Sequence, residues 1–303
     1  MAPRRRPRLA AAATERFPDL HDDWPLVRAA LDDVGVDGHP AVWSDPDVDW
    51  TAFDVVLANG AWDHTRRPAE FLAWVDRLEQ LGVPLVNSPD TLRWNLDKHY
   101  LRELEAAGVP IVPTLWVEPP GSPTGIGDGG LALDLPDAEV VVKPAISGGG
   151  HLTARYGPGA HDAARAHAGA LTAQGRAAMV QPYVAAVDDE GEKGLVFLGG
   201  SFSHAIGKEP MIRRGVGPMD VLIDNQVVTA ALASSAQLAL GRRALAAAED
   251  RLGPTTYARV DVVELDDGTP AVLELELLDP VLFFVDHPAG AATFAEVLAA
   301  RLA

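Results

Sequence analysis

The N-terminal part of the chain alternates between apolar runs and helix-forming segments. The apolar runs that predict β-strands cover residues 9–14, 41–43, 53–58 and 83–86. Residues 22–34 predict a helix with Asp22 or Asp23 as its N-cap and Gly35 as its stop. Residues 69–81 carry apolar side chains at helical spacing. This alternation of strand and helix predicts a parallel sheet with helices packed on it.

The rest of the chain mixes helices and strands with loops rich in glycine and proline. Helices are predicted before Gly108 and over residues 160–173 and 226–252, and the Pro/Gly-dense residues 118–130 predict a mobile loop. Proline cannot donate a ladder hydrogen bond, so a strand broken by Pro182 is not expected inside a sheet. The β-rich segments cover residues 140–143, 179–184, 194–198 and 202–206.

Two apolar runs near the C-terminus, residues 257–265 and 271–278, predict a β-hairpin because an Asp-Gly pair lies between them. Carboxylates stand in these strands where core residues are expected. Alternate residues of a strand share a face, so Glu274 and Glu276 point the same way, and Asp261 can face them across the ladder.

These three carboxylates would repel each other and lose solvation in an apolar sheet. A hard divalent cation removes that cost, and oxygen ligands of this kind suit Mg²⁺. The alternative is an acidic strand edge that faces solvent. The segments upstream favour the metal.

A second informative stretch begins at Lys143, which ends a β-branched strand. Buried lysine needs a partner, and a phosphate provides one. Glycines after it let backbone N–H groups approach phosphate oxygens. A flexible hairpin tip is the alternative, and the Gly-Lys-Ser order of a Walker loop is absent. The loop consists of Ser147, Gly148, Gly149 and Gly150.

Two further segments are candidates for ligand binding. Lys208, Arg213 and Arg214 cluster in a strongly acidic chain, which indicates an anion site, with solvated charge as the alternative. Residues 59–64 directly follow a predicted strand, and open α/β sheets bind ligands beyond the carboxyl ends of their strands. Trp62, Asp63 and His64 are therefore candidates for substrate binding. For the neighbouring histidine of this loop, His64, packing is the favoured interpretation.

Composition narrows the class of protein. The chain has 303 residues, of which 48% are apolar, enough for two or three packed domains. No apolar run reaches the roughly 20 residues of a membrane span, and the run after the basic residues 1–8 is too short for a secretory signal. We therefore expect a cytoplasmic protein. The absence of cysteine excludes disulfides and thiolate zinc sites, and a charge of −18 disfavours nucleic-acid binding.

The order of the motifs resembles the ATP-grasp superfamily, nearest its glutathione-synthetase-like members, and is similar to the cyclo-ligases of cycloserine biosynthesis. The resemblance rests on Lys98 before a helix, Lys143-Pro with its glycine loop, residues 181–184, Arg259-Val-Asp261 and Glu274-Leu-Glu276. It implies an α/β ATP-grasp fold with α+β character in the lid. The N-terminal Rossmann-like pre-ATP-grasp (substrate) domain would cover residues 1–90, the lid domain 91–180, and the metal-bearing domain 181–303.

The resemblance also implies ligand roles. Lys98 and Lys143 would contact the phosphates or adenine of ATP, the loop of residues 147–150 would close over the triphosphate, and Arg259 would lie near it. Mg²⁺, as two ions, would be held by Asp261, Glu274 and Glu276. Contacts to adenosine would come from Gln181, Tyr183, Val184 and Glu192.

Two departures from the family pattern bear on function. Glu276 stands where asparagine is common, which keeps an oxygen ligand and adds negative charge. Gly194 stands where glutathione synthetases often place an arginine for the glutamyl substrate, which argues against glutathione as the product.

We therefore expect an ATP- and Mg²⁺-dependent carboxylate–amine ligase that works through an acyl phosphate, with Lys208, Arg213 or Arg214 stabilising the charge on the acyl oxygen. It would either join two amino acids or cyclise one, as in antibiotic biosynthesis. A non-catalytic nucleotide-binding regulator is the alternative, and a metal-dependent hydrolase is disfavoured because no His-Glu-x-x-His motif is present. The family also suggests a homo-oligomer.

Overall fold

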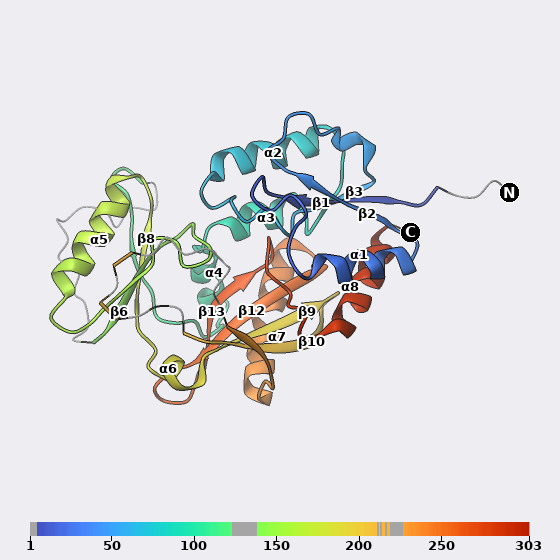
Figure 1. The fold of residues 1–303 in the computed structure, drawn as a ribbon. Helices are drawn as coiled ribbons and strands as arrows, with labels where there is room; N and C mark the ends of the chain where they lie inside the picture. The colour runs from blue at the N-terminus through green and yellow to red at the C-terminus, as the bar shows by residue number, and fades with distance from the viewer. Residues whose placement is uncertain are drawn as a thin grey trace.

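The structure is a computed structural model that describes residues 5–122, 138–210, 212, 214–215, 217–218 and 227–302. Within these residues the chain forms three β-sheets with helices packed on them (Figure 1). None of the helices in the described part is both long and apolar enough to cross a membrane.

The N-terminal sheet is parallel, as the sequence pattern predicts. Its order is β2-β1-β3-β4, and α1 (Trp24–Asp33) and α2 (Pro68–Gln80) are the two predicted helices. The C-terminal helix α8 (Pro288–Arg301) lies beside α1 and shares its core (Figure 1). The strands are β1 (Arg8–Ala13), β2 (Asp37–Val42), β3 (Val55–Leu57) and β4 (Leu85–Val86), and a 3₁₀ turn covers Trp50–Ala52.

The start of α1 differs from the prediction. Asp23 occupies the cap position, but its side chain makes no capping hydrogen bond. Its Oδ1 instead accepts the backbone N–H of Val285 at 3.0 Å. Asp23 therefore ties the helix to the C-terminal segment that precedes α8.

The central sheet is antiparallel, with the order β5-β8-β6-β7, and α5 (His161–Ala173) packs against it. The prediction that the strand with Pro182 avoids the sheet interior is wrong, because β8 lies between β5 and β6. Pro182 is the last residue of β8, and β5 pairs only as far as Val180, so the missing N–H interrupts no bond there. The strands are β5 (Leu115–Val117), β6 (Val140–Pro144), β7 (Ala154–Tyr156) and β8 (Ala178–Pro182).

The largest sheet has the order β11-β10-β9-β12-β13 and contains the predicted C-terminal hairpin, β12 (Tyr257–Glu264) and β13 (Pro270–Glu276). The long helix predicted over residues 226–252 is shorter. The first residues of the predicted range form the edge strand β11 (Val228–Ala231) instead. The helix α7 (Ser235–Leu252) begins only after a capping box at Ser234. The remaining elements are α6 (Ala186–Glu190), β9 (Glu192–Leu198) and β10 (Ser201–Lys208).

The helix predicted before Gly108 is broken into two. Asp97 is extended (φ −112°, ψ 122°) and separates α3 (Pro89–Leu96) from α4 (Tyr100–Ala106). Lys98 lies in this break, and its backbone N–H bonds the carbonyl of Ala145 just after β6 at 3.1 Å. The break therefore brings Lys98 to the glycine-rich loop.

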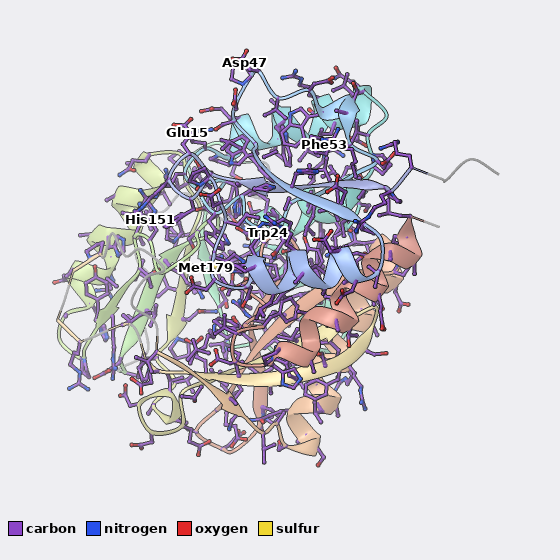
Figure 2. All side chains as sticks on the ribbon, turned by 45° about the vertical axis from the view of Figure 1, so that its right-hand side comes forward. Glu15, Trp24, Asp47, Phe53, His151 and Met179 are labelled. Carbon is purple, nitrogen blue, oxygen red and sulfur yellow. The ribbon has the colours of Figure 1, made fainter. Side chains whose placement is uncertain are left out.

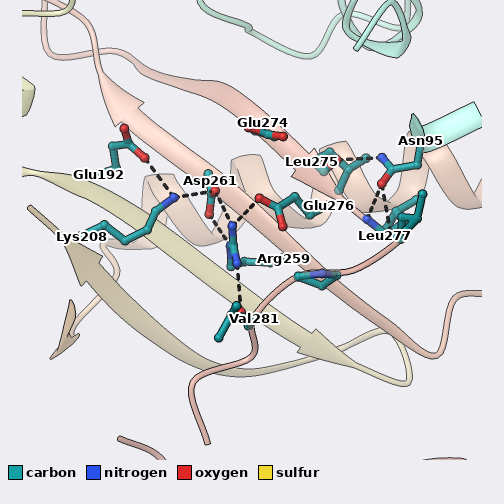
Figure 3. A network of polar contacts seen from close by, with 12 residues as sticks. Asn95, Glu192, Lys208, Arg259, Asp261, Glu274, Leu275, Glu276, Leu277 and Val281 are labelled. Atoms are coloured by element: carbon teal, nitrogen blue, oxygen red, sulfur yellow. Dashed lines mark hydrogen bonds and ion pairs between the residues drawn. The ribbon is translucent and has the colours of Figure 1, made fainter. Parts of the chain in front are cut away.

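A buried asparagine of α3 fastens the carboxylate-bearing strand. Asn95 Nδ2 donates to the carbonyl of Leu275 at 2.7 Å, and its Oδ1 accepts the N–H groups of Leu277 (2.7 Å) and Leu278 (3.1 Å). A side chain from α3 thereby fixes β13 beside Glu274 and Glu276 (Figure 3).

We expect Asn95→Ala to lower the free energy of unfolding by about 2–4 kcal/mol, because three buried backbone groups lose their partner. Denaturant unfolding measures the change. Gln174→Ala, which removes an exposed carboxamide at the end of α5, is the control and should stay within about 0.5 kcal/mol. Equal effects of the two variants would contradict the role of Asn95.

Candidate functional site

Two cavities meet at β13. The intersheet cavity lies between the central and the largest sheet, and the N-terminal cavity lies between β13 and the loops of the N-terminal sheet. The residues that line both are Lys98, Ser147, Gly148, Gly149, Arg259, Glu274 and Glu276. This shared wall contains two of the three predicted metal ligands.

The intersheet cavity gathers the residues predicted to bind ATP. Val141 and Leu273 give it apolar walls, and Gln181 is fixed by a 2.8 Å hydrogen bond from Nε2 to Thr114 Oγ1. The Arg155 guanidinium lies 3.3 Å from the centre of the Tyr183 ring. The residues that were predicted to bind ATP and that line the intersheet cavity are Lys98, Lys143, Ser147, Gly148, Gly149, Gly150, Gln181, Tyr183, Val184 and Glu192.

Lys143 is a buried cation without a counter-ion. It is 9% exposed, and no described residue lies within hydrogen-bonding or ion-pair distance of its Nζ. Burial lowers its pKa to about 8, although Glu274 and Glu192 act in the opposite direction. A ligand that brings an anion to Lys143 would remove this cost.

Lys98 connects the glycine-rich loop to β13. Its Nζ lies 3.0 Å from Glu274 Oε1 and donates to the carbonyl of Ser147. The same loop approaches the N-terminal layer, since a Cβ on Gly148 would lie 3.6 Å from the Thr65 methyl group. The loop is thus held between the two cavities.

A buried ion-pair network underlies the shared wall (Figure 3). Asp261, 2% exposed, accepts from Lys208 Nζ at 2.7 Å and from Arg259 Nε at 2.8 Å. Lys208 also pairs with Glu192 at 3.0 Å, and Arg259 also pairs with Glu276. Burial alone would raise the pKa of Asp261, but the two cations outweigh it and hold that pKa below its ordinary value.

The carboxylates do not converge as closely as predicted. Asp261 faces Glu274 across the hairpin, as expected, but within the described residues no three acidic or histidine side chains form a ready metal site. Each carboxylate has a cation instead, because Lys98, Lys208 and Arg259 neutralise them.

The residues still fit a hard divalent cation. Glu274 and Glu276 line both cavities and carry oxygen donors. Burial, together with the charges of Glu274 and Asp261, raises the pKa of Glu276 despite its bond to Arg259. Burial and the neighbouring carboxylates thus disfavour the ionised form of Glu276, and a bound cation would favour it. Asp261 could join only by exchanging one of its two cations.

The predicted cationic residues divide into two groups. Lys208 lines the intersheet cavity, and Arg259 lines both cavities. Arg214 does not reach the site, because its exposed side chain pairs with Glu139 and its backbone bridges Arg155 on β7. Arg213 lies outside the described residues.

The N-terminal cavity contains the predicted Trp62 and Asp63. Asp63 is already held by protein groups, since it accepts from Trp43 Nε1 at 2.7 Å and lies 3.6 Å from Arg67 Nη1. Figure 2 labels Glu15 in the N-terminal layer and His151, which directly follows the glycine-rich loop, and both residues line this cavity.

Sequence analysis missed one member of a polar pair on the same wall. His64, for which packing was favoured, lies in the lining with Asp279, which follows β13. Asp279 was not a candidate residue, because nothing in its local sequence distinguishes it from a turn. Its position three residues after Glu276 is the one feature of the sequence that could have indicated a place near the site.

Comparison with known proteins points to one group of enzymes. Residues 9–87 match the family model described as "D-cycloserine synthetase DcsG, N-terminal domain". The chain is 37% identical over 284 residues to the cycloserine biosynthesis protein DcsG of Streptomyces lavendulae, covering 92% of this chain and 94% of that one.

Solved structures give the same picture. The crystal structure of D-cycloserine synthetase DcsG matches with a TM-score of 0.88 and 35% identity, over 98% of this chain and 100% of that one. The D-alanine–D-alanine ligase of Bacillus anthracis, solved in complex with ATP, matches with a TM-score of 0.62 and 16% identity, over 97% and 98% of the two chains. This second similarity shows the fold alone.

Gly194 on β9 tests how tightly the buried network is packed. A Cβ there would lie 2.9 Å from Ile206 Cδ1, 3.0 Å from Asp261 Oδ1 and 3.1 Å from Arg259 Cδ. We expect Gly194→Ala to destabilise the protein by about 1–3 kcal/mol, measured by denaturant unfolding, because these side chains must shift. Gly207→Ala on β10 is the matched control, since its nearest contact would be 3.5 Å. If Gly194→Ala left the free energy of unfolding unchanged, the network would not be tightly packed at this position.

Proposed function

Since the chain belongs to the D-cycloserine synthetase family of ATP-grasp ligases and is an ATP-dependent C–N ligase, we propose that it closes a ring within one amino-acid-like molecule. The product would be a cyclic amide of the cycloserine type, made as a step in antibiotic biosynthesis. One observation carries the proposal. Two cavities share the wall of Lys98, Arg259, Glu274 and Glu276, so ATP in one and a substrate carboxylate in the other would meet there.

ATP would occupy the intersheet cavity. Gln181, Tyr183 and Val184 would contact adenine, and Glu192 the ribose. Lys98, Lys143 and the loop of residues 147–150 would contact the phosphates. The unpaired buried charge of Lys143 and the apolar walls support this placement.

Glu274 and Glu276 would hold Mg²⁺, and Asp261 would join them by exchanging a bond to Lys208 or Arg259. When bound, the metal would neutralise phosphate oxygens during phosphoryl transfer. The upward shift of the pKa of Glu276, caused by burial and neighbouring carboxylates, supports this assignment.

In the first half of the reaction, a substrate carboxylate oxygen would attack the γ-phosphorus of ATP, releasing ADP and forming an acyl phosphate. An amine or hydroxylamine-type nitrogen of the same molecule would then attack the acyl carbon, releasing phosphate. Arg259, which lines both cavities, would stabilise charge on the acyl oxygen. In this proposal Arg259 would share or replace the role that the sequence had suggested for Lys208, Arg213 or Arg214. The loop of residues 147–150 would exclude water from the intermediate.

Ring closure is favoured over joining two molecules by the strength of the similarities. The match to D-cycloserine synthetase has a TM-score of 0.88, against 0.62 for the D-alanine–D-alanine ligase. The N-terminal cavity carries both acidic and basic side chains, among them Glu15, Asp63 and Arg67, which suits a zwitterionic amino acid. A cytoplasmic location and a homo-oligomeric assembly stay predictions.

The reaction can be tested directly. The protein would be incubated with ATP, Mg²⁺ and a panel of amino acids, including analogues that carry an O-amino group, singly and in pairs. We expect phosphate release with one compound alone and a product lighter than that compound by one water. A condensed product that needs two compounds would show an intermolecular ligase. MgATP binding with no phosphate release across the panel would favour a nucleotide-binding regulator.

Lys143→Met should separate stability from nucleotide binding. In the free protein the pKa of Lys143 is about 8, below the ordinary 10.5, so the penalty is fully present below about pH 8 and is relieved as pH rises toward 10.5. At pH 7 the variant should gain roughly 3 kcal/mol and melt several degrees higher. MgATP should no longer stabilise it. Lys193→Met is the control, because Lys193 follows Glu192 on β9 but lies outside both cavity linings. A variant that still gains stability from MgATP would contradict the role of Lys143.

A further inference from the structure

A histidine–aspartate pair lines the N-terminal cavity, outside the residues assigned to ATP and Mg²⁺. His64 lies in the turn after β3, is 6% exposed, and has its Nδ1 3.1 Å from Asp279 Oδ2. The same nitrogen lies 2.9 Å from the backbone carbonyl of Ala61. Both side chains belong to the cavity wall.

These contacts set the tautomer of the ring. The carbonyl oxygen of Ala61 only accepts hydrogen bonds, and so does the ionised carboxylate of Asp279, so Nδ1 must carry a hydrogen. In the neutral ring the lone pair is then on Nε2. A carboxylate behind Nδ1 fixes the ring and stabilises its protonated form, which is the arrangement of a histidine general base.

Packing holds the His64 ring in place, and neighbouring charges shift its pKa. The His64 ring packs against Phe71, with 5.3 Å between ring centroids. Two charged groups act on it: Asp279, and Lys98 of the shared wall. Burial and Lys98 lower the pKa of His64, but Asp279 outweighs them and raises it above the ordinary 6.5. The carboxylate of Asp279 therefore stabilises the protonated ring that forms when Nε2 accepts a proton.

We propose that His64, oriented by Asp279, is the catalytic base of the ring-closing half-reaction. This inference rests on the proposed function. The substrate nitrogen forms its bond to the acyl carbon, the bond from that carbon to the phosphate oxygen breaks, and phosphate leaves with the bonding electrons. The proton released by the nitrogen goes to Nε2 of His64. Transfer of the phosphoryl group from ATP does not use this residue.

The test compares ADP with cyclic product in the first turnover of the complete reaction. In wild-type protein each ADP should accompany one product. In His64→Gln, ADP should still form, while product formation should slow by about 10²–10⁴-fold and ADP should exceed product. Asp279→Asn should have the same effect, more weakly, and it keeps the test available if His64→Gln does not fold.

His39→Gln is the matched control. His39 Nε2 pairs with Asp37 at 3.0 Å on β2, and neither residue lines the N-terminal cavity, so this variant should keep the wild-type ratio. A normal ratio in His64→Gln with a raised KM would overturn the inference, because the histidine would then only bind substrate. A wild-type protein that makes ADP but never a cyclic product would overturn the proposed function instead, and this inference with it.

Discussion

The salt bridges that Asp261 makes inside the largest sheet are the constraint on which the candidate site depends. Asp261 on β12 lies between Lys208 of β10 and Arg259 of its own strand, and it is 2% exposed. Removing one partner of a buried ion pair typically costs about 3–5 kcal/mol, because a charge is left uncompensated. The network therefore fixes the relative position of the strands that line both cavities. The absence of a side chain at Gly194 is part of that packing.

The site is assembled from parts that are distant in sequence. Asn95 from α3 holds β13, and Asn87 donates to the carbonyls of Tyr257 and Leu277 at 2.8 Å each. Lys98, in the break between α3 and α4, joins the glycine-rich loop to Glu274. The helices after the N-terminal sheet are thus a scaffold for the carboxylates, and the shared wall is formed only when the layers are packed together.

Much of the fold follows from local signals. The Asp-Gly turn and flanking apolar runs predict the hairpin, and the residues around Lys143 predict an anion site, because turn chemistry and burial act over a few residues. Errors arose where distant packing decides. Nothing in residues 226–252 marks the edge strand β11, which forms only because β10 is beside it. Arg214 follows Lys208 closely in sequence, yet it pairs with Glu139, just before β6, and so lies away from the site. His64 and Asp279 are brought together by tertiary structure alone.

In the free site, burial disfavours the charged form of two groups of opposite sign, Lys143 and Glu276. Lys143 has no anionic partner within ion-pair distance among the residues that the structure describes, and burial lowers its pKa. Glu276 lies among other carboxylates, and burial together with them raises its pKa. A nucleotide alone would satisfy Lys143 but bring further negative charge to Glu276, whereas a cation alone would relieve Glu276 and leave Lys143 unpaired. Only the two together neutralise both groups. If both ligands bind as proposed, each would improve the electrostatic environment of the other, so their binding would be favourably coupled, and thermodynamic linkage would make that coupling reciprocal.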